Sequence, residues 1–352
     1  MRKKVAIGLS GGVDSSVAAA LLLRQGYEVV AVTMRHLPAE TTNSCCSLEA
    51  VVDARRVAKK LGIKHFLADV EGTFYQRVIE PFELGYLQGT TPNPCAMCNR
   101  YIKFGAMWDW AKSQGCEYLA TGHYVRRVVR DDGGFELWRA RDLSKDQSYL
   151  LYSLGQEDLA HCLFPLGEYQ KSKTRALAEE WGLVTAHKPN SQELCFVPKN
   201  DYAGYLEKSR PESRRSGDIV NRAGKVVGTH HGIAFYTIGQ RKGLGITAST
   251  PQYVVALDET SNRVVVGGRE DVLADTVRVD KVHYVAGSAP SSAYSGQVKV
   301  RYSMDPAPAV WTAQGTDTAT VRFQEPQWAI TPGQIATLYD GEQLLAGGRI
   351  VK

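Results

Sequence analysis

The seven residues Ser10-Gly-Gly-Val-Asp-Ser-Ser16 constrain the fold more than any other part of the sequence. They follow the apolar run Val5–Leu9 and precede a helical pattern over Val17–Leu23 that ends at Gly26. A glycine-rich turn between a strand and a helix lets backbone N–H groups approach a phosphate closely. The helix N-terminus adds a partial positive charge. The segment therefore predicts a phosphate-binding loop at the end of a strand.

The loop differs from the phosphate loop of simple phosphoryl-transfer enzymes. That loop requires G-x-x-x-x-G-K-[ST], and its lysine is missing from Ser10–Ser16. The segment instead resembles the pyrophosphate-binding loop of ATP pyrophosphatases, which cut between the α and β phosphates and leave AMP on the substrate. A bare Ser-Gly-Gly turn is usually structural, but the full motif between a strand and a helix favours nucleotide binding.

Composition excludes several classes of protein. The chain has 352 residues, 43% hydrophobic and 22% charged, which is typical of a globular protein of two or three domains. It has no apolar run long enough for a membrane span, and Met1-Arg-Lys-Lys4 leads directly into a strand, so we expect a cytoplasmic protein. Seven cysteines, an odd number, favour catalytic or metal-binding thiols over a disulfide scaffold. The net charge of +5 alone says little about partners.

The first part of the chain alternates strand-like and helix-like patterns, which predicts a doubly wound, parallel α/β sheet over residues 1–200. In such sheets ligands bind beyond the carboxyl ends of the strands, where Ser10–Ser16 falls. The expected strands are Val5–Leu9, Glu28–Met34, His65–Val70 and Tyr118–Thr121, and the expected helices include Ser47–Leu61 and Asn99–Gln114.

The pattern changes near residue 200 to short alternating segments. Two hairpins are expected over residues 217–228 and 253–266, and they predict a small β-rich central domain over 201–272. Further strands are expected over 297–302, 319–323 and 335–339. Their spacing predicts a compact β-barrel over 273–352.

Two cysteines occur in contexts that suggest chemistry. Cys98 follows two prolines, which predict a rigid lead-in, and Cys98-Asn99 is expected to open a helix. A helix N-terminus with Arg100 and Lys103 nearby lowers the pKa of a thiol and favours the reactive thiolate. Cys195 lies between two helical patterns. Either cysteine alone is more often a buried structural residue.

The order of the motifs carries more information than any one of them. They are Ser10–Ser16, Pro92–Phe104, Ala120–Tyr124, Lys145–Tyr149, Ser191–Val197, Tyr236–Gly245, Arg301-Tyr302 and Thr331–Gln334. With these motifs in this order, the sequence resembles the tRNA-specific 2-thiouridylase family (MnmA/TrmU) over nearly its entire length. The resemblance implies an ATP pyrophosphatase domain of the HUP-like class, followed by two domains that contact tRNA.

The resemblance also implies a reaction. In the family, ATP adenylates the 2-oxygen of the wobble uridine in lysine, glutamate and glutamine tRNAs. The cysteine matching Cys195 carries a persulfide sulfur received from a cysteine desulfurase or a relay protein, and that sulfur displaces AMP. The cysteine matching Cys98 either attacks the base or reduces the persulfide, which leaves a Cys98–Cys195 disulfide for a reductant to reopen.

Other site residues follow from the same motifs. ATP contacts match Gly8, Leu9, Ser10, Gly11, Gly12, Val13, Asp14, Ser15, Met34 and Gly122. Target-base contacts match Asn93, Pro94 and Cys95, and tRNA contacts match His123, Lys145, Asp146, Gln147, Arg301, Tyr302 and Gln334. Asp14 is expected either to help hold Mg²⁺ between the phosphates or to cap the helix. A lone histidine such as His123 is more often structural.

Cys95 is a departure from relatives that carry aspartate at this place. It creates Cys95-x-x-Cys98, and together with Cys195 three thiolates could hold an iron–sulfur cluster with one open iron. The alternative is that Cys95 only packs near the base. The adjacent Cys45-Cys46 are expected in a loop, and Cys116 and Cys162 in the core.

A wobble base must be extruded from the anticodon loop before an enzyme can act on it, and phosphate contacts supply much of that energy. Gln240-Arg-Lys-Gly243 offers two cations on a flexible loop. The basic clusters Arg126-Arg127 and Lys208–Arg215 are equally well explained as solvated faces. Three other functions remain open: an adenylate-forming synthetase for a small molecule, an iron–sulfur tRNA thiolase, and an RNA-binding or sulfur-carrier protein without activity.

Overall fold

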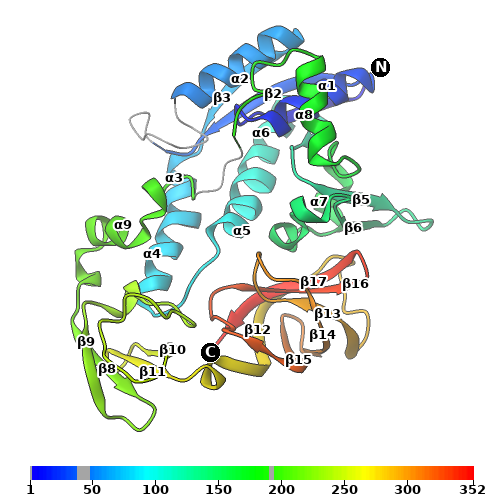
Figure 1. Cartoon of the computed structure of the whole chain (residues 1–352). Helices are drawn as coiled ribbons and strands as arrows, with labels where there is room; N and C mark the ends of the chain where they lie inside the picture. The colour runs from blue at the N-terminus through cyan, green and yellow to red at the C-terminus, as the bar shows by residue number, and fades with distance from the viewer. Residues whose placement is uncertain (1, 38–47, 190–193) are drawn as a thin grey trace.

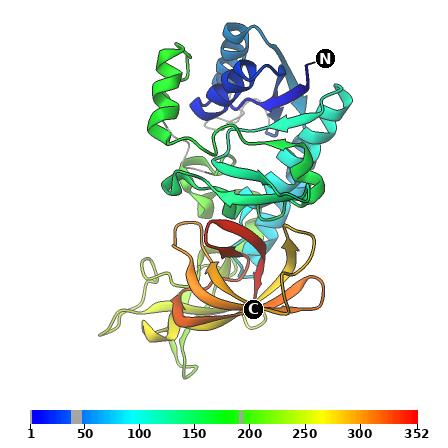
Figure 2. The same cartoon turned by 90° about the vertical axis from the view of Figure 1, so that its right-hand side faces the viewer.

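The chain folds into an N-terminal α/β region, a central region of short strands and a C-terminal barrel (Figure 1). The structure is a computed structural model and describes residues 2–37, 48–189 and 194–352. The α/β region and the barrel lie at opposite ends of the molecule (Figure 2). Cys45 and Cys46 lie outside the described residues. In the part of the chain that the structure describes, no helix is long and apolar enough to cross a membrane.

The N-terminal sheet is parallel throughout, as predicted, with strand order β3-β2-β1-β4-β7. Its strands are β1 Lys4–Gly8, β2 Glu28–Arg35, β3 Lys64–Asp69, β4 Tyr118–Ala120 and β7 Cys162–Leu163. The chain adds β2 and β3 on one side of β1, and then β4 and β7 on the other. The winding direction therefore reverses between β1 and β4, which is where doubly wound sheets bind ligands.

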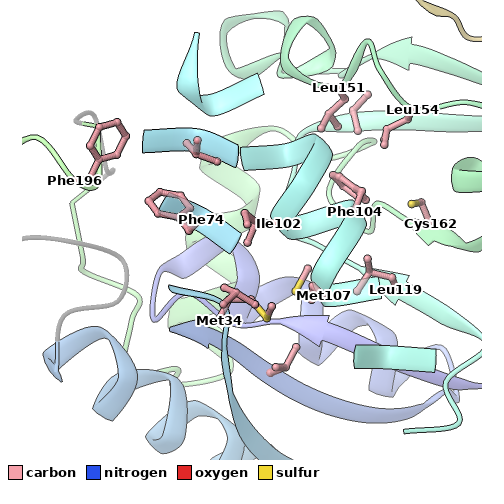
Figure 3. Packing of buried hydrophobic residues seen from close by; sticks show 14 of the residues in the cluster. Met34, Phe74, Ile102, Phe104, Met107, Leu119, Leu151, Leu154, Cys162 and Phe196 are labelled. Atoms are coloured by element: carbon pink, nitrogen blue, oxygen red, sulfur yellow. The ribbon is translucent and has the colours of Figure 1, made fainter. Parts of the chain in front are cut away.

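Helices cover both faces of this sheet. On one face, α1 (Val13–Arg24), α2 (Leu48–Leu61) and α8 (Lys171–Glu180) bury a cluster of aliphatic side chains with β1 and β2. On the other face lies a helical run of α5 (Pro94–Cys98), a π-helical segment η2 (Asn99–Ala106) and α6 (Met107–Ser113). Phe104 and Met107 of this run pack in the same cluster as Leu119 of β4 (Figure 3).

The start of that helical run corrects a prediction. The helix begins at Pro94 and not at Asn99, so Cys98 does not open it. The Oδ1 atom of Asn93 accepts a hydrogen bond from the backbone N–H of Ala96 at 3.1 Å, which caps the helix. Proline is tolerated in a first helical turn because no intrahelical partner is lost there. The Asn-Pro pair, which looked like a rigid lead-in, is the helix start itself.

The same face carries α3 (Glu71–Phe74), the π-helical segment η1 (Tyr75–Ile79) and α4 (Glu80–Leu87). Helix α4 is tied to the chain beyond residue 200 by a buried ion pair. Glu83, 2% exposed at its side chain, accepts from Nε of Arg210 at 2.8 Å. Arg210 belongs to the basic cluster Lys208–Arg215, so this cluster includes a structural cation and is not a uniformly solvated face.

The central region contains the two predicted hairpins. They are β8 (Gly217–Asn221) with β9 (Val226–His230), and β10 (Tyr253–Asp258) with β11 (Arg263–Gly267). Strands β11 and β8 pair in parallel and join the hairpins into one four-stranded sheet. Helix α9 (Tyr202–Ser209) precedes this sheet.

The C-terminal strands form a closed barrel, as predicted. Its strands are β12 (Leu273–Tyr284), β13 (Ala293–Lys299), β14 (Ala307–Gln314), β15 (Thr318–Trp328), β16 (Ile335–Asp340) and β17 (Gln343–Val351), and pairing of β12 with β17 closes it. The strand expected over 297–302 ends at Lys299, so Arg301 and Tyr302 lie in the turn that follows.

A hairpin of the N-terminal region extends the barrel sheet, which the sequence did not predict. Strands β5 (Val125–Val129) and β6 (Phe135–Arg139) pair with each other, and β6 pairs with β17. Arg126 is buried at this junction, where its guanidinium pairs with Glu342 and donates to the carbonyl of Arg139. The cluster Arg126-Arg127 is therefore not a solvated face. The Arg126 guanidinium is buried and is not accessible to a ligand.

Asp146 is the polar centre of the junction between the N-terminal region and the barrel. It is 5% exposed, and its Oδ1 accepts from the backbone N–H groups of Ala140 and Ser148 at 3.1 and 3.2 Å. Its Oδ2 accepts from the Ser148 hydroxyl at 2.9 Å and from Nε of Arg139 at 3.3 Å. The same hydroxyl lies 3.1 Å from the Tyr339 hydroxyl on β16. One carboxylate thus holds two regions together.

We expect Asp146→Asn to lower the free energy of unfolding by about 3 kcal/mol, because it leaves a donor facing a donor and removes the charge beside Arg139. Equilibrium urea unfolding measures this. The matched control is Lys145→Gln, whose half-buried side chain is not one of the hydrogen-bond donors to Asp146, and it should stay within about 0.5 kcal/mol of the parent. Equal stability of the Asp146 variant and the parent would contradict this role.

Candidate functional site

The predicted phosphate loop occupies the turn between β1 and α1. Gly11 has φ +69°, a backbone conformation that L side chains rarely adopt, and a Cβ there would lie 2.3 Å from the carbonyl oxygen of Ala50. Gly12 is the N-cap of α1, and because glycine has no side chain, no N-cap side chain binds the first N–H groups of the helix. Ser15 Oγ accepts from the N–H of Ser10 at 3.2 Å and fixes the turn. A glycine turn before an uncapped helix N-terminus is an arrangement that can bind an anion.

Gly122 lies directly against this loop. A Cβ on Gly122 would stand 2.7 Å from the backbone nitrogen of Ser15. Gly122 follows β4, and the loop follows β1, so the two segments meet at the point where the sheet reverses its winding. The structure thus brings together two of the predicted ATP-binding segments, residues 8–15 and Gly122.

Asp14 has two internal partners. Its Oδ1 accepts from the Tyr124 hydroxyl at 2.9 Å and forms an ion pair with the Lys171 ammonium. Burial first, and then the Asp14 carboxylate, raise the pKa of Tyr124. The capping position belongs to Gly12, so the expectation that Asp14 caps α1 is wrong. Within residues 2–37, 48–189 and 194–352, no group of three or more His, Cys, Asp or Glu side chains could hold a metal ion. The described side chains therefore form no ready-made magnesium site.

Met34 lies near the carboxyl end of β2, as expected for a residue beside the nucleotide. Its side chain is buried in one cluster with Phe74 and Met107 (Figure 3). Its carbonyl oxygen lies 3.2 Å from Nδ1 of His36. The side chain of Met34 therefore belongs to the hydrophobic core.

The start of the cysteine-bearing helix is bound to the barrel. The N–H of Thr91 donates to the carbonyl of Pro332 at 2.8 Å, and the Gln334 amide donates to the carbonyl of Thr91 at 2.9 Å. One turn into α5, Ala96 packs in a small cluster with Tyr149 and Ile335. The segment Asn93–Cys95, predicted to touch the target base, therefore stands between the α/β region and the barrel.

Cys95 is exposed and Cys98 is half-buried. Burial first, then Asp146 and Cys95, raise the pKa of the Tyr302 phenol, so the Cys95 thiol lies within electrostatic reach of that ring. The Arg100 guanidinium, one of the two cations expected near Cys98, pairs with Asp158 at 3.1 Å. A lowered pKa of the Cys98 thiol stays a prediction.

Cys195 borders the same hydrophobic cluster as Cys98. Its neighbour Phe196 fixes the segment, with its ring centroid 5.9 Å from that of Phe74 and 5.0 Å from that of Phe82 (Figure 3). The two cysteines predicted to share the sulfur chemistry therefore lie against one cluster on one face of the sheet. Cys116 and Cys162 are buried, as predicted, and burial raises the pKa of both thiols.

His123 and Lys103 form a contact that the sequence did not reveal. His123 is 7% exposed, with Nδ1 2.7 Å from the Thr121 hydroxyl and Nε2 3.3 Å from the Lys103 ammonium. An ammonium can only donate, so Nε2 accepts and the ring proton sits on Nδ1. Burial first, and then Lys103, lower the pKa of His123, which keeps the ring neutral. The sequence motif that contains Ile102-Lys-Phe104 included Lys103, but it did not indicate that His123 is the partner of this lysine.

Several residues predicted to contact tRNA have internal partners. Arg301 donates to the carbonyls of Ile238 and Ala329 and to the Thr331 hydroxyl, and the Gln147 amide oxygen accepts from the N–H of Tyr124 at 3.0 Å. Tyr302 is 45% exposed. Their contacts with tRNA stay predictions, and the geometry assigns Asp146, Gln147, Arg301 and Gln334 a structural role as well.

The loop Gln240–Gly243 is exposed at Arg241 and Lys242. Gly239, just before it, has φ +87°, and a Cβ there would lie 2.6 Å from that of Ala329. The loop therefore rests against the barrel. A cavity of about 580 Å³ opens beside Gly243, lined among others by Arg214, Tyr236 and His231.

Three family models together match nearly the whole chain. The family model of the tRNA methyl transferase HUP domain matches residues 3–199, that of the tRNA methyl transferase PRC-barrel domain matches 203–268, and that of the aminomethyltransferase beta-barrel domain matches 274–350. The solved U34-tRNA thiolase NcsA from Methanococcus maripaludis, with its [4Fe-4S] cluster, is similar over 59% of this chain and 67% of that chain, at 24% identity and a TM-score of 0.35. That likeness is too low to transfer the cluster to this chain.

Curated relatives are similar over their full length. The tRNA-specific 2-thiouridylase MnmA of Carboxydothermus hydrogenoformans is 47% identical over 100% of this chain and 98% of its own. The protein of the same name from Clostridioides difficile is 44% identical over 100% of this chain and 99% of its own. The chain belongs to the tRNA-specific 2-thiouridylase family.

Proposed function

We propose that this protein is a tRNA-uridine 2-sulfurtransferase, which uses ATP to replace the 2-oxygen of the wobble uridine of tRNA by sulfur. The products are 2-thiouridine, AMP and pyrophosphate. The main support for the proposal is that one helical run, Pro94–Ser113, both contacts the strand before the phosphate loop and carries Cys98. Met107 of this run would contact a Cβ placed on Gly8 at 3.1 Å, beside the phosphate loop, and Cys98 lies farther along the run toward the barrel.

Activation must precede sulfur attack, because C2 of uracil is electron-rich and barely electrophilic. In the first step the 2-oxygen attacks the α-phosphorus of ATP, and pyrophosphate leaves. We assign phosphate binding to the uncapped N–H groups at the start of α1 and to the backbone of Gly122, which lies against them. Positive partial charge there stabilises the negative charge that the transition state gathers on the phosphate oxygens.

Sulfur transfer then uses the two cysteines. The terminal sulfur of a Cys195 persulfide attacks C2, and AMP leaves. The Cys98 thiolate attacks the Sγ atom of Cys195 and breaks the S–S bond, so the outer sulfur stays on the base and a Cys98–Cys195 disulfide forms. In the alternative sequence, Cys98 attacks the base first. Either way a dithiol must reduce the disulfide before the next turnover.

Mg²⁺ would enter with the phosphates of ATP and neutralise part of their charge. The ion pair of Asp14 with Lys171 leaves that carboxylate a less suitable ligand than the phosphate oxygens themselves. An iron–sulfur cluster on Cys95, Cys98 and Cys195 is less well supported than a persulfide, because the described conformations of these residues form no group able to hold a metal.

The tRNA partner is supported by the site's construction. A synthetase for a small-molecule adenylate needs neither two cysteines nor a barrel bound to the helix that carries one of them. The hydrogen bonds from Thr91 to Pro332 and from Gln334 to Thr91 couple the barrel to this helix. We infer that the substrates are the lysine, glutamate and glutamine tRNAs, and that the sulfur comes from a cysteine desulfurase or a relay protein in the cytoplasm. Pyrophosphate release with tRNA, compared with small-molecule acceptors, tests this assignment.

Cys98→Ala and Cys195→Ala should each lower thiolation of tRNA at least about a thousandfold while tRNA-dependent pyrophosphate release stays within about threefold, because activation needs no sulfur. Mass spectrometry of digested tRNA and a pyrophosphate assay measure the two steps. Cys116→Ala, which changes a buried thiol outside the site, is the matched control.

Cys95→Ala separates the persulfide route from the cluster route. An active Cys95 variant supports the persulfide. Loss of thiolation in all three site variants, together with an anaerobically bound chromophore, would contradict the persulfide route and favour the iron–sulfur cluster.

Arg241→Ala should weaken tRNA binding several-fold and reduce the slope of log affinity against log salt concentration by about 0.9, because one phosphate contact is lost. A filter-binding series from low to physiological salt measures both. The control is Lys59→Ala, an exposed cation on α2, on the sheet face opposite the cysteine-bearing helix. An unchanged salt dependence in the Arg241 variant would refute this contact.

A further inference from the structure

Lys103 is a half-buried cation whose charge is not matched by a carboxylate. Among the described residues its ammonium has one hydrogen-bond acceptor, the neutral ring of His123, and no carboxylate within 4.0 Å. By contrast, Lys171, on the other side of the phosphate loop, is paired with Asp14. A cation removed from water costs free energy unless an anion compensates it. The Lys103 ammonium has three N–H donors and uses one of them on His123, so it is suited to bind an anion.

The position of Lys103 indicates which anion. Met107, one helical turn later, packs beside Gly8 at the end of β1, and His123 follows Gly122 at the end of β4. The ammonium therefore lies by the point where the sheet reverses its winding, where the phosphate loop meets Gly122. Lys103 lies between Met107 and Cys98 along this helical run.

The backbone around Lys103 sets the direction in which its side chain extends. Asn99–Ala106 is a π-helical segment, and a Cβ on Gly105 would lie 3.2 Å from the carbonyl of Arg100. A π segment widens the turn and shifts the face that its side chains present, and such segments occur often at functional sites. Here Arg100 pairs with Asp158, whereas Lys103 reaches His123.

We propose that Lys103 is a catalytic residue of the activation step and that His123 is its positioning residue. The Lys103 ammonium binds a non-bridging oxygen of the α-phosphate of ATP, and the neutral imidazole holds the ammonium at that place. This inference rests on the proposed function, since it assigns a residue to its first step.

The step balances without a further reactant. The uridine 2-oxygen forms a bond to the α-phosphorus, the bond from that phosphorus to the bridging oxygen of the β-phosphate breaks, and pyrophosphate carries away the electron pair. Lys103 stays protonated throughout and donates hydrogen bonds to the oxygens that gain negative charge. The same contact stabilises AMP when sulfur later displaces it.

The test is single-turnover release of pyrophosphate from ATP by the full chain with tRNA and without a sulfur donor. Lys103→Met should slow this release at least about a hundredfold, with the dissociation constants of ATP and tRNA within about threefold of the parent. Lys103→Arg should restore part of the rate, because it keeps the charge. The matched control is Lys112→Met on α6, which removes an exposed cation paired with Asp109 and should change nothing.

The outcomes separate this inference from the function on which it rests. If the parent protein releases no pyrophosphate with tRNA, the proposed function fails. If the parent is active and Lys103→Met matches it, the role of Lys103 is overturned and the proposed function stands. A variant with normal pyrophosphate release but slower alkylation of Cys98 would show that Lys103 serves the thiolate, which also overturns the inference.

His123 is tested by two substitutions that differ in one property. Glutamine keeps an acceptor for Lys103, and leucine removes it. His123→Gln should therefore retain a pyrophosphate-release rate at least about tenfold above that of His123→Leu, at equal ATP affinity and similar thermal stability. Equal rates in the two variants would show that His123 only fills space, and would overturn its positioning role.

Discussion

The helical run from Pro94 to Ser113 is held at both ends, and the site depends on this. Near the sheet, Met107 lies beside Gly8 and fixes the run against the strand that carries the phosphate loop. Near the barrel, Thr91 and Ala96 are bound by residues of β16 and of the turn before it. A helix fixed at two points can present side chains to a substrate between those points with little loss of entropy on binding.

The sequence located the catalytic sheet well, because its signals are local. Short apolar runs placed β1 to β4 within one residue of their observed ends, and the loop Ser10–Ser16 lies where it was expected. The start of the cysteine-bearing helix was misplaced because proline was taken as a rigid lead-in, although Asn93-Pro94 is also a capping pair. The hairpin β5–β6 was missed although Asp132-Gly133 between two strand-like segments is a local turn signal. Its pairing with β17 joins residues about two hundred positions apart, and no local pattern encodes that pairing.

The site residues, too, were only partly predictable from the sequence. Motifs named Asp146, Gln147 and Arg301, but only the folded chain shows that each already has protein partners. A buried polar group must satisfy its hydrogen bonds whether or not it also meets RNA. A motif that recurs for structural reasons therefore resembles a motif that recurs for binding, and geometry alone separates them. Tyr302 and Arg241, which are exposed, carry no such double requirement.

The proposed position of Lys103 offers a reason why the phosphate loop itself has no lysine. In loops that transfer the γ-phosphate, the lysine follows the glycines on the same helix and so reaches the distal phosphates. Here the cation lies on the opposite helical layer, on η2, and approaches the crevice between β1 and β4 from the side of the cysteine. A positive charge on that side stabilises the α-phosphate, which is the phosphate nearest the acceptor. The backbone N–H groups of α1 then bind the β- and γ-phosphates, which leave as pyrophosphate. The bond weakened by such a division lies between the α and β phosphates, and it is the bond whose cleavage leaves AMP on the base.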